Sequence, residues 1–127
     1  MSTTTILRRL AGAVAVAAAA LGLAAAPALA HTQVASTSPK SGRTASKAPR
    51  SVTVTFTGQI RRGTLTVTRA GKRVSRGSGG VDPRSVKRLR VALRSGLRSG
   101  TYTARWSIVA ADGHHQHGSF RFKVRRR

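Results

Sequence analysis

The histidine at position 31 follows a signal-peptidase motif, and this placement gives it chemistry that an internal histidine lacks. Ala28, Leu29 and Ala30 form an A-x-A site, so cleavage after Ala30 would make His31 the first residue of the mature protein. The free α-amine and the imidazole of one residue can then close a chelate ring on a single metal ion. This chelate requires that the peptide bond before His31 is cut.

The other three histidines and one of the two acidic residues lie together in residues 111–118 (ADGHHQHG). Asp112 and His114 are separated by one glycine, so in an extended or tight-turn backbone their side chains can converge. With the amine and imidazole of His31 they would supply three nitrogens and one oxygen. Such a set suits a tetragonal Cu(II) centre and also tolerates Ni(II) or Zn(II). We therefore predict a metal site formed by His31, Asp112 and His114.

The mature chain offers no sulfur ligand. Cysteine is absent, and the one methionine, Met1, leaves with the signal. Because Cu(I) prefers soft sulfur ligands, we predict that Cu(II) binds tightly and Cu(I) poorly. His115 and His117 are better interpreted as solvated residues of a polar hairpin, and whether they form a second site stays open.

The first 30 residues have the organisation of an export signal. Arg8 and Arg9 form the positive start, residues 10–26 are rich in Ala, Val and Leu, and Pro27 precedes the cleavage site. A transmembrane anchor is the alternative, but the apolar stretch is shorter than the roughly 20 residues that a spanning helix needs. We predict a signal peptide at residues 1–30, one domain at residues 31–127, and export to the periplasm, cell envelope or medium. The route, Sec or twin-arginine, stays open.

The chain is strongly basic. It has 24 lysines and arginines against two acids, Asp82 and Asp112, and loss of Arg8 and Arg9 with the signal leaves a net charge of +20. A field of this size attracts polyanions without sequence preference. We predict nonspecific association with anionic envelope polymers or lipids, and no specific recognition of nucleic acid. An arginine-rich proteome is the alternative explanation of the charge.

Apolar and polar residues alternate in five segments. The segment at residues 86–93 is the least regular. Glycines predict a chain reversal at residues 58–63, and a hairpin followed by a long, mobile loop at residues 69–84. Residues 36–50, rich in Ser, Pro, Lys and Gly, suit an opening turn. The alternating apolar residues are Val52, Val54, Phe56, Leu65, Val67, Val86, Leu89, Val91, Leu93, Tyr102, Ala104, Trp106, Ile108, Phe120, Phe122 and Val124.

These segments predict an all-β fold. Six or seven short strands in about 97 residues, with no helical pattern after the signal, match an immunoglobulin-like Greek-key β-sandwich that encloses the aromatic residues. Trp106 lies on the apolar face of its segment and is interpreted as a core residue rather than a ligand platform. Tyr102 follows a glycine at the start of a strand, where it can form a tyrosine-corner hydrogen bond or simply pack as a half-buried ring.

Four segments join the N-terminal histidine in a family resemblance. They are residues 36–42 (STSPKSG), 52–56 (VTVTF), 100–106 (GTYTARW) and 112–120 (DGHHQHGSF). With them the chain resembles the CopC-type bacterial copper-binding proteins, whose S-x-P-x-x-G motif the first segment resembles. The resemblance implies an exported cupredoxin-like or immunoglobulin-like β-sandwich that holds Cu(II) and takes part in copper resistance, trafficking or supply.

The resemblance also implies particular ligands and a partner. It assigns Cu(II) to His31, Asp112 and His114, and it implies a membrane copper transporter of the CopD type. Gly58 stands where many members have an acidic residue, so one further carboxylate ligand is missing. No segment matches the methionine-rich Cu(I) site of some members, and the Cu(II)-only type is the better analogue.

Three functions from different classes stay open at this point. A copper carrier or buffer without enzymatic activity is favoured, because the predicted ligands fill the equatorial plane and no acid-base pair stands beside them. A copper-dependent oxidase or monooxygenase would use the same site, but the chain is short, has few aromatic residues and predicts no substrate groove. The third is a polyanion-binding envelope protein with incidental histidines.

Overall fold

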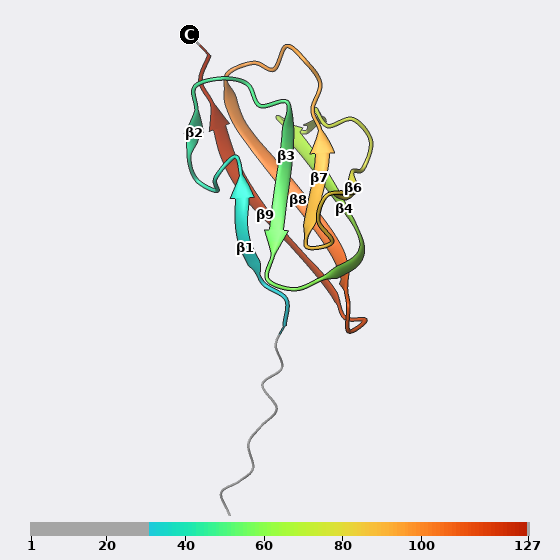
Figure 1. Ribbon diagram of the computed structural model, residues 1–127. Helices are drawn as coiled ribbons and strands as arrows, with labels where there is room; N and C mark the ends of the chain where they lie inside the picture. The colour runs from blue at the N-terminus through green and yellow to red at the C-terminus, as the bar shows by residue number, and fades with distance from the viewer. Residues whose placement is uncertain (1–30, 127) are drawn as a thin grey trace, which may run out of the picture. The chain divides into compact units, whose positions relative to one another are not determined.

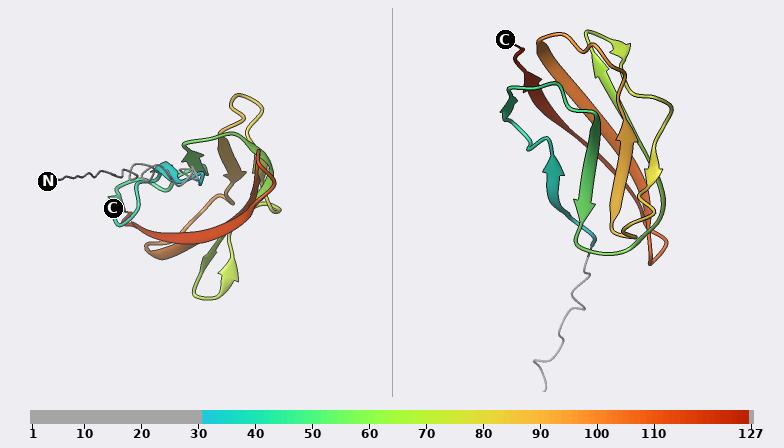
Figure 2. Two further views of the ribbon diagram at one scale, coloured as in Figure 1. Left: turned by 90° about the horizontal axis from the view of Figure 1, so that it is seen from below. Right: turned by 45° about the horizontal axis from the view of Figure 1, so that its top comes forward.

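The computed structural model describes residues 31–126. These residues fold into two β-sheets that pack face to face (Figures 1 and 2). The four-stranded sheet has the order β1-β3-β7-β6, and the five-stranded sheet has the order β2-β9-β8-β4-β5. Paired strands are antiparallel except for β2 and β9. The predicted signal peptide lies outside the described residues. The strands are β1 (Val34–Ser38), β2 (Thr44–Ala45), β3 (Ser51–Phe56), β4 (Ile60–Arg69), β5 (Lys72–Arg73), β6 (Gly80–Val81), β7 (Arg88–Ala92), β8 (Gly100–Ala110) and β9 (His115–Val124).

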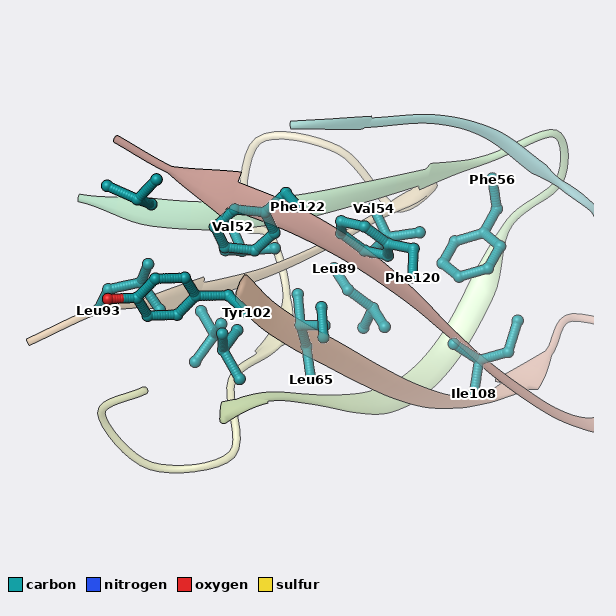
Figure 3. Packing of buried hydrophobic residues seen from close by; sticks show 14 of the residues in the cluster. Val52, Val54, Phe56, Leu65, Leu89, Leu93, Tyr102, Ile108, Phe120 and Phe122 are labelled. Carbon is teal, nitrogen blue, oxygen red and sulfur yellow. The ribbon is translucent and has the colours of Figure 1, made fainter. Parts of the chain in front are cut away.

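The core lies between the sheets, because each strand turns its apolar residues inward and its polar residues outward. β3 buries Val52, Val54 and Phe56, and the hydroxyl residues between them stay half-exposed. β9 buries Phe120 and Phe122 in the same way. Figure 3 shows these side chains meeting between the two layers. The alternation read from the sequence therefore predicted these core residues of β3 and β9 correctly.

The predicted all-β sandwich is confirmed. Residues 31–126 contain no helix, and six of the nine strands have five or more residues. Trp106 is half-buried and packs edge-on against Phe56, with ring centroids 5.0 Å apart, as expected of a core residue. Tyr102 is fully buried and its hydroxyl donates a hydrogen bond to the carbonyl of Arg98, which is the tyrosine corner. Burial raises the pKa of the Tyr102 hydroxyl.

The connection between β3 and β4 is shorter than the predicted reversal at residues 58–63. β3 ends at Phe56, β4 begins at Ile60, and the chain passes from one sheet to the other. Gly63 lies inside β4, where a Cβ atom would lie 2.7 Å from the carbonyl oxygen of Ser107. This glycine therefore allows close packing within the sheet and takes no part in the turn.

The hairpin predicted at the start of residues 69–84 is present as β4–β5, but the long loop predicted after it is wrong. β6 pairs with β7, and Ser75 forms an isolated bridge with Leu93. The Ser75 hydroxyl also accepts a hydrogen bond of 3.0 Å from the backbone N–H of Val67. The glycines predicted the turns correctly, whereas the strand pairs depend on segments distant in sequence.

A buried carboxylate fixes the connection between β6 and β7. Asp82 is 5% exposed and accepts hydrogen bonds from the backbone N–H of Arg84 at 2.9 Å and from Nε of Arg88 at 3.0 Å. The backbone hydrogen bond first, and Arg88 second, lower the pKa of this carboxyl. β7 begins only at Arg88, and Val86, which was predicted to lie in this strand, is 54% exposed.

Candidate metal centre

The turn between β8 and β9 carries the predicted carboxylate and imidazole at one end of the sandwich, the lower end in Figure 1. The backbone N–H of Gly113 donates to the carbonyl of Ala110, and the N–H of Ala110 donates to the carbonyl of His114, both at 2.9 Å. Gly113 has φ of 91°, in the left-handed region that favours glycine. The glycine between Asp112 and His114 thus lets the chain turn within the four residues that separate β8 from β9.

Asp112 and His114 are in direct contact, as their spacing predicted. Nδ1 of His114 lies 2.8 Å from Oδ2 of Asp112, and the backbone N–H of His114 donates to Oδ1 at 3.0 Å. The backbone hydrogen bond, the imidazole of His114 and the charge of His31 lower the pKa of the Asp112 carboxyl. An ionised carboxylate therefore orients the imidazole, and both side chains are at least half exposed.

His31 reaches this turn because the segment behind it is held by two parts of the chain. Gln33 exchanges hydrogen bonds with Thr57: its N–H donates to the Thr57 hydroxyl at 3.0 Å, and its carbonyl accepts from the Thr57 N–H at 2.8 Å. From β9, Nε2 of Gln116 donates to the carbonyl of Thr32 at 2.8 Å. The imidazole of His31 then lies edge-on to that of His114, with ring centroids 5.7 Å apart.

Gln116 is a residue beside the candidate site that the sequence reasoning missed. It alternates with the exposed residues of β9, so its side chain lies on the inner side of the strand, below the N-terminal segment. Its Oε1 atom is buried and has no hydrogen-bond partner in the described part of the chain. A polar residue at an inward position of a predicted apolar face was the signal that could have found it.

Trp106 closes the core beside the candidate site. It lies opposite Gly118 in the β8–β9 register, and a Cβ atom on that glycine would lie 2.5 Å from the Trp106 ring. The glycine therefore lets the indole lie flat over the backbone of β9.

His115 and His117 lie beyond the turn, in the second strand of the β8–β9 hairpin. Both belong to β9 and are exposed, paired with Val109 and Ser107 of β8. Alternation along the strand puts them on the outer face of the five-stranded sheet, whereas Gln116 points inward. Of the four consecutive residues from His114, the first lies in the turn, His115 and His117 lie on the outer face, and Gln116 points inward. Of these, His114 contacts His31.

The observed geometry of His31 and His114 fits one metal ion held between the two imidazoles. Two imidazoles that share one ion at about 2.0 Å have ring centroids roughly 4.5 to 6.4 Å apart, from adjacent to opposite positions. The separation of 5.7 Å between His31 and His114 lies within this range. Nδ1 of His114 already contacts Asp112, which leaves its Nε2 for an ion.

Side chains alone do not complete the site. Within residues 31–126, no three side chains of His, Cys, Asp or Glu are grouped as a ready metal site. The predicted donor set adds the α-amine that cleavage before His31 would free.

The described residues form a small two-sheet β-sandwich, and comparison with known proteins gives the family. Residues 34–125 match the CopC domain, so the chain belongs to the CopC family, whose members are binding proteins and not enzymes. No curated protein matches the chain significantly.

Two solved structures are similar to this chain. CopC from Methylosinus trichosporium OB3b has 20% sequence identity and a TM-score of 0.65, over 76% of this chain and 95% of that one. PcoC, a methionine-rich copper resistance protein from Escherichia coli, has 26% identity and a TM-score of 0.60, over 76% of this chain and 100% of that one. The similarity to the first structure supports the fold. The second structure shows that a copper resistance protein has a similar fold and sequence.

Proposed function

We propose that this protein is an exported Cu(II)-binding protein that acts in copper resistance, buffering or trafficking. One observation carries the proposal: His31 and His114, from opposite ends of the domain sequence, lie with ring centroids 5.7 Å apart, and Asp112 contacts His114. The match to the CopC domain and the likeness to a copper resistance protein support copper as the cargo.

Each group has a distinct role in this proposal. The amine and imidazole of His31 chelate the ion from the N-terminal segment, and the imidazole of His114 binds it from the β8–β9 turn. Asp112 supplies a carboxylate whose charge offsets that of the ion. In the uncomplexed geometry it contacts Nδ1 of His114, on the side of the ring away from Nε2, so ligation of the same ion by its oxygen requires that this contact breaks and one of the two side chains turns.

Cu(II) is the valence that the donor set selects. Nitrogen and oxygen ligands favour Cu(II), whereas Cu(I) prefers thiolate and thioether sulfur. PcoC is methionine-rich, while this chain has one methionine, Met1, and no cysteine. Chelator competition for each valence should give one tightly bound Cu(II) and weak binding of Cu(I). Tight binding of Cu(I) after removal of His115 and His117 would contradict this assignment.

Export and exchange complete the proposal. Cleavage after Ala30 releases the domain that begins at His31, outside the cytoplasm. Within residues 31–126, no helix is long and apolar enough to cross a membrane. His114 and Asp112 are 58% and 50% exposed, which suits transfer of the ion to or from a partner such as a CopD-type membrane copper transporter.

One added residue tests the chelate. A protein that begins at His31 is compared with the same protein preceded by a single glycine, which converts the ligating amine into an amide and leaves the strands intact. The Cu(II) affinity of the extended protein should fall at least about 100-fold, with the stability of the copper-free fold unchanged. His31→Ala should behave similarly, and His117→Ala serves as a matched control. Equal affinity of the extended and mature proteins would exclude the chelate.

A further inference from the structure

The outer face of the five-stranded sheet is lined with cations. Alternation in β4, β8 and β9 turns one set of residues outward, and the strand register arranges this set in rows across the sheet. In order along β9, the rows are Arg62, Val109 and His115; Thr64, Ser107 and His117; Thr66, Arg105 and Ser119; Thr68, Thr103 and Arg121; Thr101 and Lys123. We call these residues the outer face.

The cations of this face have no acidic neighbours within it. Arg62, Arg105, Arg121 and Lys123 are exposed. The chain has only two acids: Asp82 pairs with Arg88 beyond this face, and Asp112 lies in the β8–β9 turn. The positive charge of the outer face is therefore not neutralised within the described residues.

The solvent side of the four-stranded sheet carries fewer free cations in β3 and β7. The outward residues of β3 are Ser51, Thr53 and Thr55, and those opposite them in β7 are Ala92, Arg90 and Arg88. Arg88 is engaged by Asp82, which leaves Arg90 as the remaining cation in these two strands. The two faces of one sandwich thus differ in charge, and net charge alone does not explain that difference.

Length and chemistry indicate the kind of ligand. From His115 to Lys123 the face extends about 27 Å along β9, at about 3.4 Å per residue. This is longer than a single small anion, so only a polymer can contact all the rows. At one end, Arg62, Thr64, Ser107 and His115 line a shallow hollow of about 260 Å³, floored by Val109. Guanidinium and hydroxyl donors together suit phosphate oxygens.

Aromatic residues decide between two kinds of phosphate polymer. Proteins that bind single-stranded nucleic acid usually stack the bases on aromatic side chains. The outer face has no Phe, Tyr or Trp in its rows, because Tyr102 and Trp106 of β8 and Phe120 and Phe122 of β9 pack on the inner side. The face offers contacts to a phosphate backbone and none to bases.

We propose that the outer face is a docking surface for a linear, non-nucleic phosphodiester polymer of the cell envelope. Arg105, Arg121 and Lys123 bind its phosphates, and the row of Arg62 and His115 holds one phosphate in the hollow. The ligand chemistry is that of a poly(glycerol phosphate) chain. This surface begins at the strand residue that follows the β8–β9 turn, uses other side chains than the candidate metal centre and does not depend on copper.

Two variants with the same net charge distinguish binding at the outer face from attraction by the net charge of the protein. One variant carries Arg105→Gln, Arg121→Gln and Lys123→Gln; the control carries Arg76→Gln, Arg90→Gln and Arg94→Gln, which are exposed cations outside the face. Binding to synthetic poly(glycerol phosphate) is measured over a range of salt. The face variant should lose at least about tenfold in affinity and its salt slope should fall by about two, with a much smaller loss for the control. Equal losses would overturn the proposal.

Wild-type protein supplies a test that does not depend on folding of the variants. Bound poly(glycerol phosphate) should protect Lys123 from acetylation and leave Lys87, which is exposed outside the face, reactive. Equal protection of both lysines would overturn the proposal. Single-stranded DNA of equal charge should bind no more tightly than poly(glycerol phosphate), and clearly tighter binding of DNA would overturn the choice of polymer.

Discussion

The β8–β9 turn and the outer face of the same two strands carry different chemistry and are built in different ways. In the turn, Asp112 and His114 meet His31 through contacts between segments distant in sequence. On the outer face, cations such as Arg105 and Arg121 gather because strand residues alternate. A site of the first kind should fail when one contact is lost, whereas a surface of the second kind should weaken by increments.

Removal of a single ligand in the turn should have the largest effect. Asp112→Ala and His114→Ala each delete one donor, and the Cu(II) dissociation constant should rise about 100-fold or more in chelator competition. His115→Ala and His117→Ala remove imidazoles from the outer face and should change it by less than about threefold. If the second pair weakened binding more than the first, β9 and not the turn would hold the ion.

Acid should release copper from the turn progressively. An amine and an imidazole bind copper only when deprotonated, so protons compete with the ion, and the apparent affinity should fall between about pH 7 and pH 4. Titrations with Cu(II) at several pH values measure this fall. Polymer binding to the outer face should not fall over the same range, because the arginines and the lysine of this face stay charged. An affinity for copper that did not vary with pH would contradict the proposed ligands.

A smaller effect is expected at Gln116, which positions a ligand without touching the ion. Gln116→Leu removes the hydrogen bond to the Thr32 carbonyl, so the Cu(II) affinity should fall about tenfold. The copper-free fold should keep its stability, because the same change removes a buried oxygen without a partner.

Two further variants show whether Gln116 acts through its position. Gln116→Glu keeps an oxygen acceptor but loses the donor to Thr32, and it should also bind Cu(II) more weakly. His117→Leu, on the opposite side of the same strand, should bind normally. If Gln116→Leu kept the wild-type Cu(II) affinity and an unchanged Cu(II) electron paramagnetic resonance spectrum, Gln116 would not position a copper ligand.

The smallest effect on copper is expected at Asp82, which lies in neither region. The pKa of the Asp82 carboxyl is lower in the folded protein than in the unfolded chain. The carboxylate therefore stabilises the fold at pH values above its unfolded-state pKa, and this contribution is lost as the pH falls through its folded-state pKa. Asp82→Asn should lower the melting temperature by a few degrees at neutral pH, and the difference from wild type should shrink below about pH 4. A constant difference across this range would show that the charge of Asp82 is not what stabilises the fold. Copper affinity should not change.

The core and the sandwich could be predicted from the sequence because they follow from alternation within single strands. Val52, Val54 and Phe56 read as one buried face, and β3 buries them. The same rule failed for Val86, because the hydrogen bonds of Asp82 hold the chain in a turn until Arg88. Local alternation does not include such a contact.

The site was predictable in part. The glycine between Asp112 and His114 indicated their convergence, and the cleavage motif singled out His31. The inward face of Gln116 follows from extending the alternation of Phe120 and Phe122, but the sequence did not show that the strand reaches back to His115, because that start is set by pairing with β8.

Intact-mass measurement of the exported protein, with and without Cu(II) under native conditions, tests the central claim most directly. The account predicts a mature chain that begins at His31 and gains the mass of one copper ion. An exported chain that begins at another residue and still gains the mass of one copper ion would contradict it.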